Sequence, residues 1–293
     1  MTRSAPIVLA ALMLGVAFGQ LACADAEPEE GPSEKSGATV EGGESYSPVP
    51  PVEPPLENPE RMKRYARSGA LRDMVRTKKD VRDFTAAWAL NPDGLFANTF
   101  LGVPTIQNPN DVWITQELLS EVKPDFVVEA GTLEGGSAAL WATFLEQINP
   151  EAKVITIDVF DNVTAAKDLP IVKERVEFLI GSSVDPKIVA KVRKRVAGGR
   201  VMVILDSDHR EAHVYSELRA YAPMVSLGSY LIVQDTGIAL PRYERWPGRN
   251  FASAGADRAV RRFLEEDRRF QNDLWRERLV LTHNPGGYLR RVR

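Results

Sequence analysis

The sequence is poor in cysteine, histidine and long apolar runs, and each shortage excludes a class of protein. Cys23 is the only cysteine, so no internal disulfide can form. The three histidines show no evident two-histidine, one-carboxylate iron set, which argues against an oxygenase. The apolar run at residues 6–18 is too short to span a bilayer comfortably, and no basic stretch is long enough to indicate nucleic-acid binding.

The first 24 residues have the pattern of an export signal. Arg3 gives a basic start, the apolar run follows, and A-C-A at 22–24 is a small-residue exit. Cys23 lies where a bacterial lipoprotein would be acylated, which would tether the chain to a membrane. Gln20 replaces the aliphatic residue usual at such sites, so cleavage after Ala24 is an alternative. We expect an exported or membrane-anchored protein, or a cytoplasmic one if the start codon is mis-called.

A charged linker and a larger domain follow the signal. Residues 25–60 hold ten acidic residues, one lysine and a proline cluster, a composition that predicts a disordered tether. Residues 61–293 hold 35 basic and 30 acidic residues, so a modestly basic domain could accept an anionic substrate. We expect its first part, 61–110, to be an N-terminal helical extension with a helix over 62–88.

Apolar runs alternate with helix-length segments through the rest of the chain. We predict strands at 126–128, 154–157, 176–180, 201–205 and 230–233, and helices at 111–122, 138–148, 185–196, 211–221 and 254–266. This alternation predicts an α/β fold with a mostly parallel, doubly wound sheet. Residues 278–282 and 288–292 flank N-P-G-G and are predicted to form a C-terminal antiparallel hairpin. Trp113 is expected in the core.

The chain is organised around residues 125–137, D-F-V-V-E-A-G-T-L-E-G-G-S. A short apolar run ends in Glu129, and glycines at 131, 135 and 136 precede an apolar helix. Such a turn lets a ligand approach backbone N–H groups at a helix start. The spacing is not the dinucleotide G-x-G-x-x-G. Acid-x-Gly-x-x-x-Gly resembles class I S-adenosylmethionine (SAM) methyltransferases, and a tight turn without a ligand is the alternative.

A polar residue follows each predicted strand within two positions, and ligands bind at the carboxyl ends of such strands. Asp158 follows Gly131 by 27 residues, a position suited to the hydroxyls of a cofactor ribose, although it could instead cap a helix. The predicted cofactor-binding residues are Glu129, Gly131, Gly135, Ser137, Asp158, Ser182 and Asp206.

Acidic residues also crowd two neighbouring strand ends. Asp206, Asp208 and Asp235 would repel one another without a counter-charge, and oxygen ligands favour Mg²⁺ or Ca²⁺. In the alternative, Asp206 binds the cofactor and Asp208 caps the next helix. His209 is a candidate general base with Asp208 beside it, or is merely paired with the acids. His213 is expected to be structural, and His283 to have no acidic neighbours.

Several motifs in order resemble the cephalosporin hydroxylase family from about residue 95 to the C-terminus. They are G-V-P at 102–104, the 125–137 stretch, L-D-S-D-H at 205–209, A-Y-A-P-M-V at 220–225, G-S-Y at 228–230, Q-D-T at 234–236 and N-P-G-G-Y at 284–288. That family is similar to SAM-dependent O-methyltransferases, including rhamnosyl O-methyltransferases. The resemblance implies a Rossmann-like methyltransferase fold, SAM, and Mg²⁺ held by Asp206, Asp208, Gln234 and Asp235. The family usually has Glu-Asp-Thr where this chain has Gln234-Asp-Thr.

The resemblance implies an enzyme that methylates a hydroxyl of a sugar, glycolipid or secondary metabolite. The alternative is a non-catalytic, exported or membrane-tethered binding protein that keeps the fold, which the signal-like N-terminus favours because SAM is made in the cytoplasm. The expected partner is a small-molecule or glycan hydroxyl, without nucleic acid. A membrane tether through Cys23 and a homo-oligomer stay open.

Overall fold

The computed structural model describes Phe84, residues 96–237 and residues 254–293. The predicted signal, linker and most of the predicted helix over 62–88 lie outside these residues. Phe84 is helical and 62% exposed.

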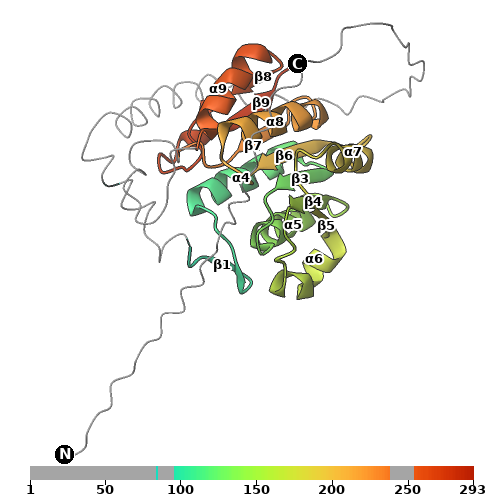
Figure 1. Ribbon diagram of the computed structural model, residues 1–293. Coiled ribbons are helices and arrows are strands. Elements are labelled where there is room, and N and C mark those ends of the chain that lie inside the picture. Colours follow the sequence, from blue (N-terminus) through green and yellow to red (C-terminus); the bar gives the residue numbers. More distant parts are fainter. Residues whose placement is uncertain (1–83, 85–95, 238–253) are drawn as a thin grey trace, which may run out of the picture. The chain divides into compact units, whose positions relative to one another are not determined.

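A seven-stranded sheet forms the centre of the described domain (Figure 1). Its strand order is β5-β4-β3-β6-β7-β9-β8, and β5, β4, β3, β6 and β7 are parallel neighbours. The strands are β3 (Phe126–Ala130), β4 (Lys153–Asp158), β5 (Val176–Ile180), β6 (Val201–Leu205), β7 (Tyr230–Val233), β8 (Phe270–Asn272) and β9 (Tyr288–Arg291). The predicted doubly wound, mostly parallel sheet is confirmed.

Helices cover both faces of this sheet (Figure 1). They are α4 (Pro109–Val122), α5 (Gly136–Ile148), α6 (Pro170–Arg175), α7 (Pro186–Arg195), α8 (Glu211–Tyr221) and α9 (Ala256–Glu266). Alternate strand residues point to opposite faces. Val128 and Val203 therefore pack with α7, α8 and α9, whereas Val127 and Met202 pack with α4 and α5.

Shorter elements complete the domain. They are the antiparallel pair β1 (Thr99–Phe100) and β2 (Val103–Pro104), and the 3₁₀ turns η2 (Ala165–Asp168), η3 (Ala222–Met224) and η5 (Leu274–Glu277). Pro109 and Pro186 occupy the first turns of α4 and α7, where Asn108 and Asp185 cap the helices.

Two predictions of local structure are wrong. Residues 278–282 form no strand, because this segment lies along α4, where the Arg278 guanidinium binds Glu117 and the Thr282 hydroxyl binds Asp111. The strand that pairs with β9 is β8, so the antiparallel end of the sheet has a long connection. Trp113 is not in the core: it is 58% exposed, and its Nε1 donates to Glu117 on the same helix.

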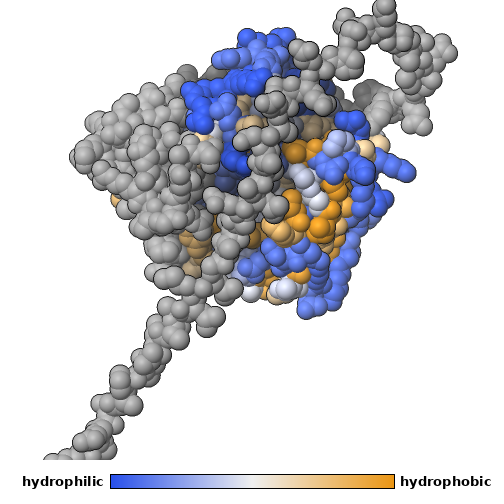
Figure 2. All heavy atoms as spheres, in the orientation of Figure 1, coloured by the Kyte–Doolittle hydropathy of each residue, from blue (hydrophilic) through white to orange (hydrophobic). Residues whose placement is uncertain are grey.

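A pocket opens at the amino ends of the parallel strands. Its lining includes Phe126, Lys153 and Val176, the first residues of β3, β4 and β5. On the face shown in Figure 2, apolar residues gather between α6 and α7 with hydrophilic residues around them. Ligands of open α/β sheets bind at the carboxyl ends of the strands. The candidate site therefore lies at the other edge.

Candidate active site

Backbone hydrogen bonds bring the strand ends of the candidate site together. Gly131 N donates to Ile157 O, Asp206 N donates to Ala130 O, and Gln234 N donates to Leu205 O. Each bond continues the parallel ladder one residue beyond the strands. The predicted residues after β3, β6 and β7 therefore lie side by side at one edge of the sheet.

The glycine loop between β3 and α5 is packed closely against this edge. Gly131 has a φ of +98°, and a Cβ there would lie 2.1 Å from the backbone oxygen of Asp206. A Cβ on Gly136 would lie 2.0 Å from Thr105 Oγ1. These glycines are required by the protein's own packing, whether or not a ligand also approaches the loop. Gly135, with a φ of +86°, precedes the first turn of α5.

Asp158 holds the glycine loop from the end of β4. Its Oδ2 accepts hydrogen bonds from the backbone N–H groups of Thr132 (3.0 Å) and Leu133 (2.9 Å), and its Oδ1 accepts one from Phe160 N (3.1 Å). The carboxylate thus fixes two strand-to-helix connections. Its predicted contact with a ribose stays a prediction.

Glu129 lies inside the protein beneath the loop. Its side chain is 0% exposed and accepts hydrogen bonds from Trp141 Nε1 (2.9 Å) and Thr156 Oγ1 (2.7 Å). Desolvation raises the pKa of Glu129 to about 7, against the lowering effect of hydrogen bonds from Thr156, Ser137 and Trp141. Of the other predicted cofactor residues, Ser137 is buried and Ser182 is half-buried.

Asp206, His209 and Asp235 form a cluster with the donors of a metal site. One donor atom from each lies within 4.8 Å of the others. His209 Nε2 is 3.3 Å from Asp235 Oδ2, and Gln107 Nε2 donates to Asp206 Oδ2 at 3.0 Å. Desolvation of the carboxyl and the charge of Asp235 raise the pKa of Asp206 well above its ordinary value. Two carboxylates in this setting are stabilised by a cation.

The other predicted members of the metal site lie differently. Both carboxylate oxygens of Asp208 bind the Arg210 side chain, and Asp208 Oδ1 also accepts from Arg210 N. Desolvation alone would raise the pKa of Asp208, but the hydrogen bonds and the charge of Arg210 together lower it. Asp208 is thus not in the three-residue cluster, and its roles as ligand and catalytic residue stay predictions. Gln234 adjoins Asp235 at the end of β7 and is 7% exposed.

Two histidines have neighbours that sequence reasoning placed incompletely. His283 lies beside acids from distant segments: its Nδ1 is 3.8 Å from Asp235 Oδ1, and its backbone N donates to Asp111 Oδ2. The prediction that it has no acidic neighbours is therefore wrong. His213 Nε2 lies 3.4 Å from the buried carboxylate of Glu217 on α8. The hydrogen bond with Glu217 is the largest effect on the pKa of His213, and that pKa is raised.

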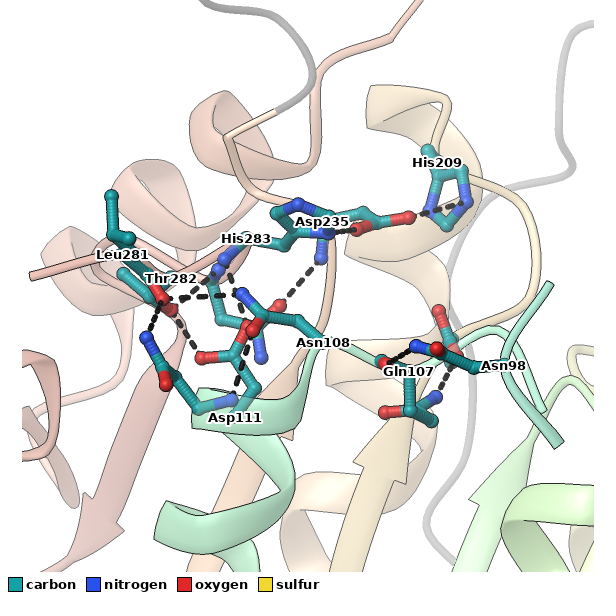
Figure 3. A network of polar contacts seen from close by, with 12 residues as sticks. Asn98, Gln107, Asn108, Asp111, His209, Asp235, Leu281, Thr282 and His283 are labelled. Atoms are coloured by element: carbon teal, nitrogen blue, oxygen red, sulfur yellow. Dashed lines mark hydrogen bonds and ion pairs between the residues drawn. The ribbon is translucent and has the colours of Figure 1, made fainter. Parts of the chain in front are cut away.

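Sequence reasoning missed Gln107, which contacts Asp206, and also Asn108 and Asp111, which begin α4 and bind residues 281–283 (Figure 3). The run Q-N-P-N-D carries a helix-start signal, with Asn108 as N-cap and a proline in the first turn. That signal locates a helix but does not show that its amino end faces Asp206. The contact spans 99 residues of sequence and depends on the order of the strands.

Comparison with known proteins identifies the family of the chain. The family model described as "Rhamnosyl O-methyltransferase/CmcI" matches residues 95–292. The chain belongs to this family. Its curated relatives include the rhamnosyl O-methyltransferases of Mycobacterium tuberculosis, 38% identical over 143 residues, and of Mycobacterium leprae, 32% identical over 157 residues. The matches span 48% and 51% of this chain and 57% and 66% of the relatives.

A solved structure supports the fold of this family member. It is a cmcI structure named with Mg and SAM, with a TM-score of 0.51 and 18% identity, and the match covers 68% of this chain and 78% of the other. At that identity the likeness shows the Rossmann-like methyltransferase fold, as the resemblance implied.

Within the described residues, no helix combines the length and apolar character needed to cross a membrane.

Proposed function

We propose that this chain is a SAM-dependent O-methyltransferase, assisted by Mg²⁺, that methylates a hydroxyl of a sugar, glycolipid or secondary metabolite. The observation that carries the proposal is the junction of a glycine loop with the Asp206, His209 and Asp235 cluster at one edge of the sheet. Family membership and the curated rhamnosyl O-methyltransferases give it chemical direction. The solved cmcI structure is named with both cofactors.

The residues around the glycine loop fit SAM. A nucleoside with a charged amino-acid tail needs a backbone turn without side chains and polar groups at neighbouring strand ends. Gly131 and Gly135 supply the turn, Asp158 supplies a carboxylate at the end of β4, and the half-buried Ser182 supplies a hydroxyl after β5. The bound cofactor would supply an electrophilic methyl group.

The residues at the ends of β6 and β7 fit a hard divalent cation. Asp206 and Asp235 offer carboxylate oxygens, and Gln234 offers an amide oxygen in place of a family carboxylate. Burial, and after it the charge of Asp235, raises the pKa of Asp206, and a nearby cation would favour the ionised carboxylate. Mg²⁺ held there would acidify an acceptor hydroxyl.

His209 is the proposed general base, which leaves the cation to Asp206, Asp235 and Gln234, because an imidazole nitrogen bound to a cation cannot accept a proton. Asp235 Oδ2 lies 3.3 Å from its Nε2, so the carboxylate can orient the ring and stabilise its protonated form. Bound SAM would supply the methyl group to the acceptor oxygen, and His209 would accept the proton of that hydroxyl. The products are the methyl ether, S-adenosylhomocysteine and a proton, so charge and atoms balance.

Isothermal titration of the full chain with SAM, with and without Mg²⁺, tests the proposal. We expect saturable SAM binding, and Mg²⁺ binding that weakens at least about tenfold in Asp235→Asn. Asp168→Asn is the matched control, because Asp168 is an exposed carboxylate on η2, near Lys173 and outside the cluster. Absence of SAM binding by the parent would refute the proposal, and equal Mg²⁺ binding by Asp235→Asn would refute the metal site.

A second candidate is a non-catalytic, exported or membrane-tethered binding protein. The signal-like residues 1–24 favour it, because SAM is made in the cytoplasm, and so does the amide of Gln234 in place of a ligand carboxylate. Mass spectrometry of the mature N-terminus decides the location. A lipid-modified Cys23, or a start at Asp25, would support export, whereas intact residues 1–24 in the cytoplasmic fraction would exclude it.

A further inference from the structure

The end of β7 is bound by a distant piece of the chain, residues 282–287. Asp235, Thr236 and Gly237, which follow β7, each make a hydrogen bond to it. The bonds run from Asp235 N to Asn284 Oδ1, from Thr236 Oγ1 to Pro285 O and from Gly237 N to His283 O, each 2.9 Å long. The backbone of a candidate metal ligand is thus set by a segment about fifty residues further along.

Asp235 has a left-handed backbone. Its φ is +57°, a conformation that costs most residues other than glycine roughly 1–2 kcal/mol, although aspartate adopts it more readily than most because its side chain can hydrogen-bond locally. Asn284 is 1% exposed and accepts the N–H of Asp235. A Cβ on Gly287 would lie 2.1 Å from Val233 O, so this part of the segment packs directly on the end of β7.

The 282–287 segment is itself fixed to the amino end of α4. Asp111 is 3% exposed, and its Oδ1 accepts from Thr282 Oγ1 (2.5 Å) and Tyr288 Oη (2.8 Å). Its Oδ2 accepts from His283 N (2.8 Å). These bonds, drawn in part in Figure 3, link a buried helix residue to the segment that holds Asp235.

The same segment places a side chain against the Asp235 carboxylate. His283 Nδ1 lies 3.8 Å from Asp235 Oδ1, while His209 Nε2 lies 3.3 Å from Oδ2 (Figure 3). The two imidazoles flank the carboxylate from separate segments. At 3.8 Å the His283 contact is too long for a hydrogen bond, so any effect of His283 on the carboxylate is electrostatic and steric.

We propose that the 282–287 segment is the positioning element of the candidate metal site, with Asn284 as its principal residue. Asn284 holds the left-handed backbone of Asp235, and His283 orients the carboxylate toward Asp206 and His209. Asp111 anchors both through Thr282 and the backbone. This inference rests on the proposed function for the identity of the cation, but its geometric content concerns the protein alone.

The test compares Asn284→Ala with Asn272→Ala in the full chain. Asn272 Nδ2 donates to Gly286 O, so the control also removes one side-chain bond to the 282–287 segment, but not one to Asp235. Mg²⁺ is titrated calorimetrically with SAM present, SAM is titrated separately, and amide hydrogen exchange is followed at 234–237. Removing a residue that orients a metal ligand typically weakens metal binding about tenfold or more.

We expect Asn284→Ala to bind Mg²⁺ about tenfold more weakly, to bind SAM like the parent, and to exchange the Asp235 amide faster. Asn272→Ala should match the parent in all three measurements. Unchanged exchange at Asp235 in a folded Asn284→Ala protein would overturn the inference, as would equal Mg²⁺ affinity.

If Asn284→Ala does not fold, His283→Ala replaces it, because that variant keeps the backbone hydrogen bonds of residue 283. Unchanged Mg²⁺ affinity in His283→Ala would also overturn the inference. If the parent binds SAM but no Mg²⁺, the metal assignment fails, and amide exchange still decides the positioning role.

Discussion

Glu129→Gln should remove a pH-dependent loss of stability from this protein. The Glu129 carboxyl is fully buried and accepts hydrogen bonds from Trp141 and Thr156. Burial opposes its charge more strongly than these bonds favour it, so its pKa rises from 4.5 to about 7 on folding. A glutamine can keep both contacts, because its oxygen accepts from Trp141 and its amide donates to the Thr156 hydroxyl.

The sign follows from the two pKa values. Since the folded pKa is the higher one, the stabilising effect is fully present below pH 4.5 and is lost as the pH rises through 7. At about 1.36 kcal/mol for each pH unit between the two values, the loss is about 3 kcal/mol by pH 8. The carboxyl is fully buried, so solvent does not screen this effect.

Urea unfolding followed by tryptophan fluorescence measures the difference. Between pH 4.5 and pH 8, the free energy of unfolding of the parent should fall by about 3 kcal/mol relative to Glu129→Gln. Glu134→Gln in the same loop is the control, because Glu134 is only half-buried, and its pH profile should follow the parent's. Parallel profiles for the parent and Glu129→Gln would refute the reasoning.

The same variant tests the predicted contact of Glu129 with SAM. If the Glu129 carboxylate contacts only buried protein groups and not the cofactor, Glu129→Gln should bind SAM with an affinity close to the parent's at pH 8. A loss of SAM affinity of tenfold or more in a folded variant would show instead that the carboxylate reaches the cofactor.

Three further substitutions have expected outcomes. Gly131→Ala should lower the free energy of unfolding by about 3 kcal/mol, because its Cβ would meet Asp206 O. Gly198 also has a positive φ but has open space around it, so Gly198→Ala should lower the free energy of unfolding by only about 1 kcal/mol. Equal losses for the two variants in urea unfolding would contradict this reasoning. Gln234→Glu should tighten Mg²⁺ binding on the order of tenfold by calorimetry, and an unchanged affinity would place residue 234 outside the site. Arg276→Met should lower the free energy of unfolding by about 3 kcal/mol, because the fully buried guanidinium is paired with Glu121 and Asp273. A melting temperature equal to the parent's would show that these ion pairs contribute no net stability.

The parallel part of the fold could be predicted from the sequence because its signals are local. Five apolar runs separated by helix-length segments allow few arrangements other than a parallel sheet. The wrong strand at 278–282 shows where that reasoning stops. An apolar run beside N-P-G-G has the pattern of a hairpin, but contacts of Arg278 and Thr282 with α4 hold this run along the helix.

The candidate site was predictable only as far as strand ends determine it. Asp206 and Asp235 follow neighbouring parallel strands, so their proximity follows from the topology. Asp208 is two residues from Asp206 in sequence, yet Arg210 binds its carboxylate, a local choice that spacing does not reveal. Gln107 precedes the first parallel strand in the sequence and His283 follows the last, yet both contact the site. No local sequence pattern predicts contacts of this kind.

Gln234 connects the charge of this site with its stability. The Asp206 carboxyl is already desolvated and close to Asp235, and its pKa is raised before any further charge is added. A glutamate at position 234 would add a third negative charge beside this pair, so the protein without a cation would become less stable. A bound cation would reverse that cost, because binding to the folded state alone stabilises it by mass action. At the proposed metal site, glutamine would therefore bind a cation less tightly than glutamate but would destabilise the cation-free protein less. Gln234→Glu should accordingly melt below the parent in EDTA and gain more stability than the parent when Mg²⁺ is added.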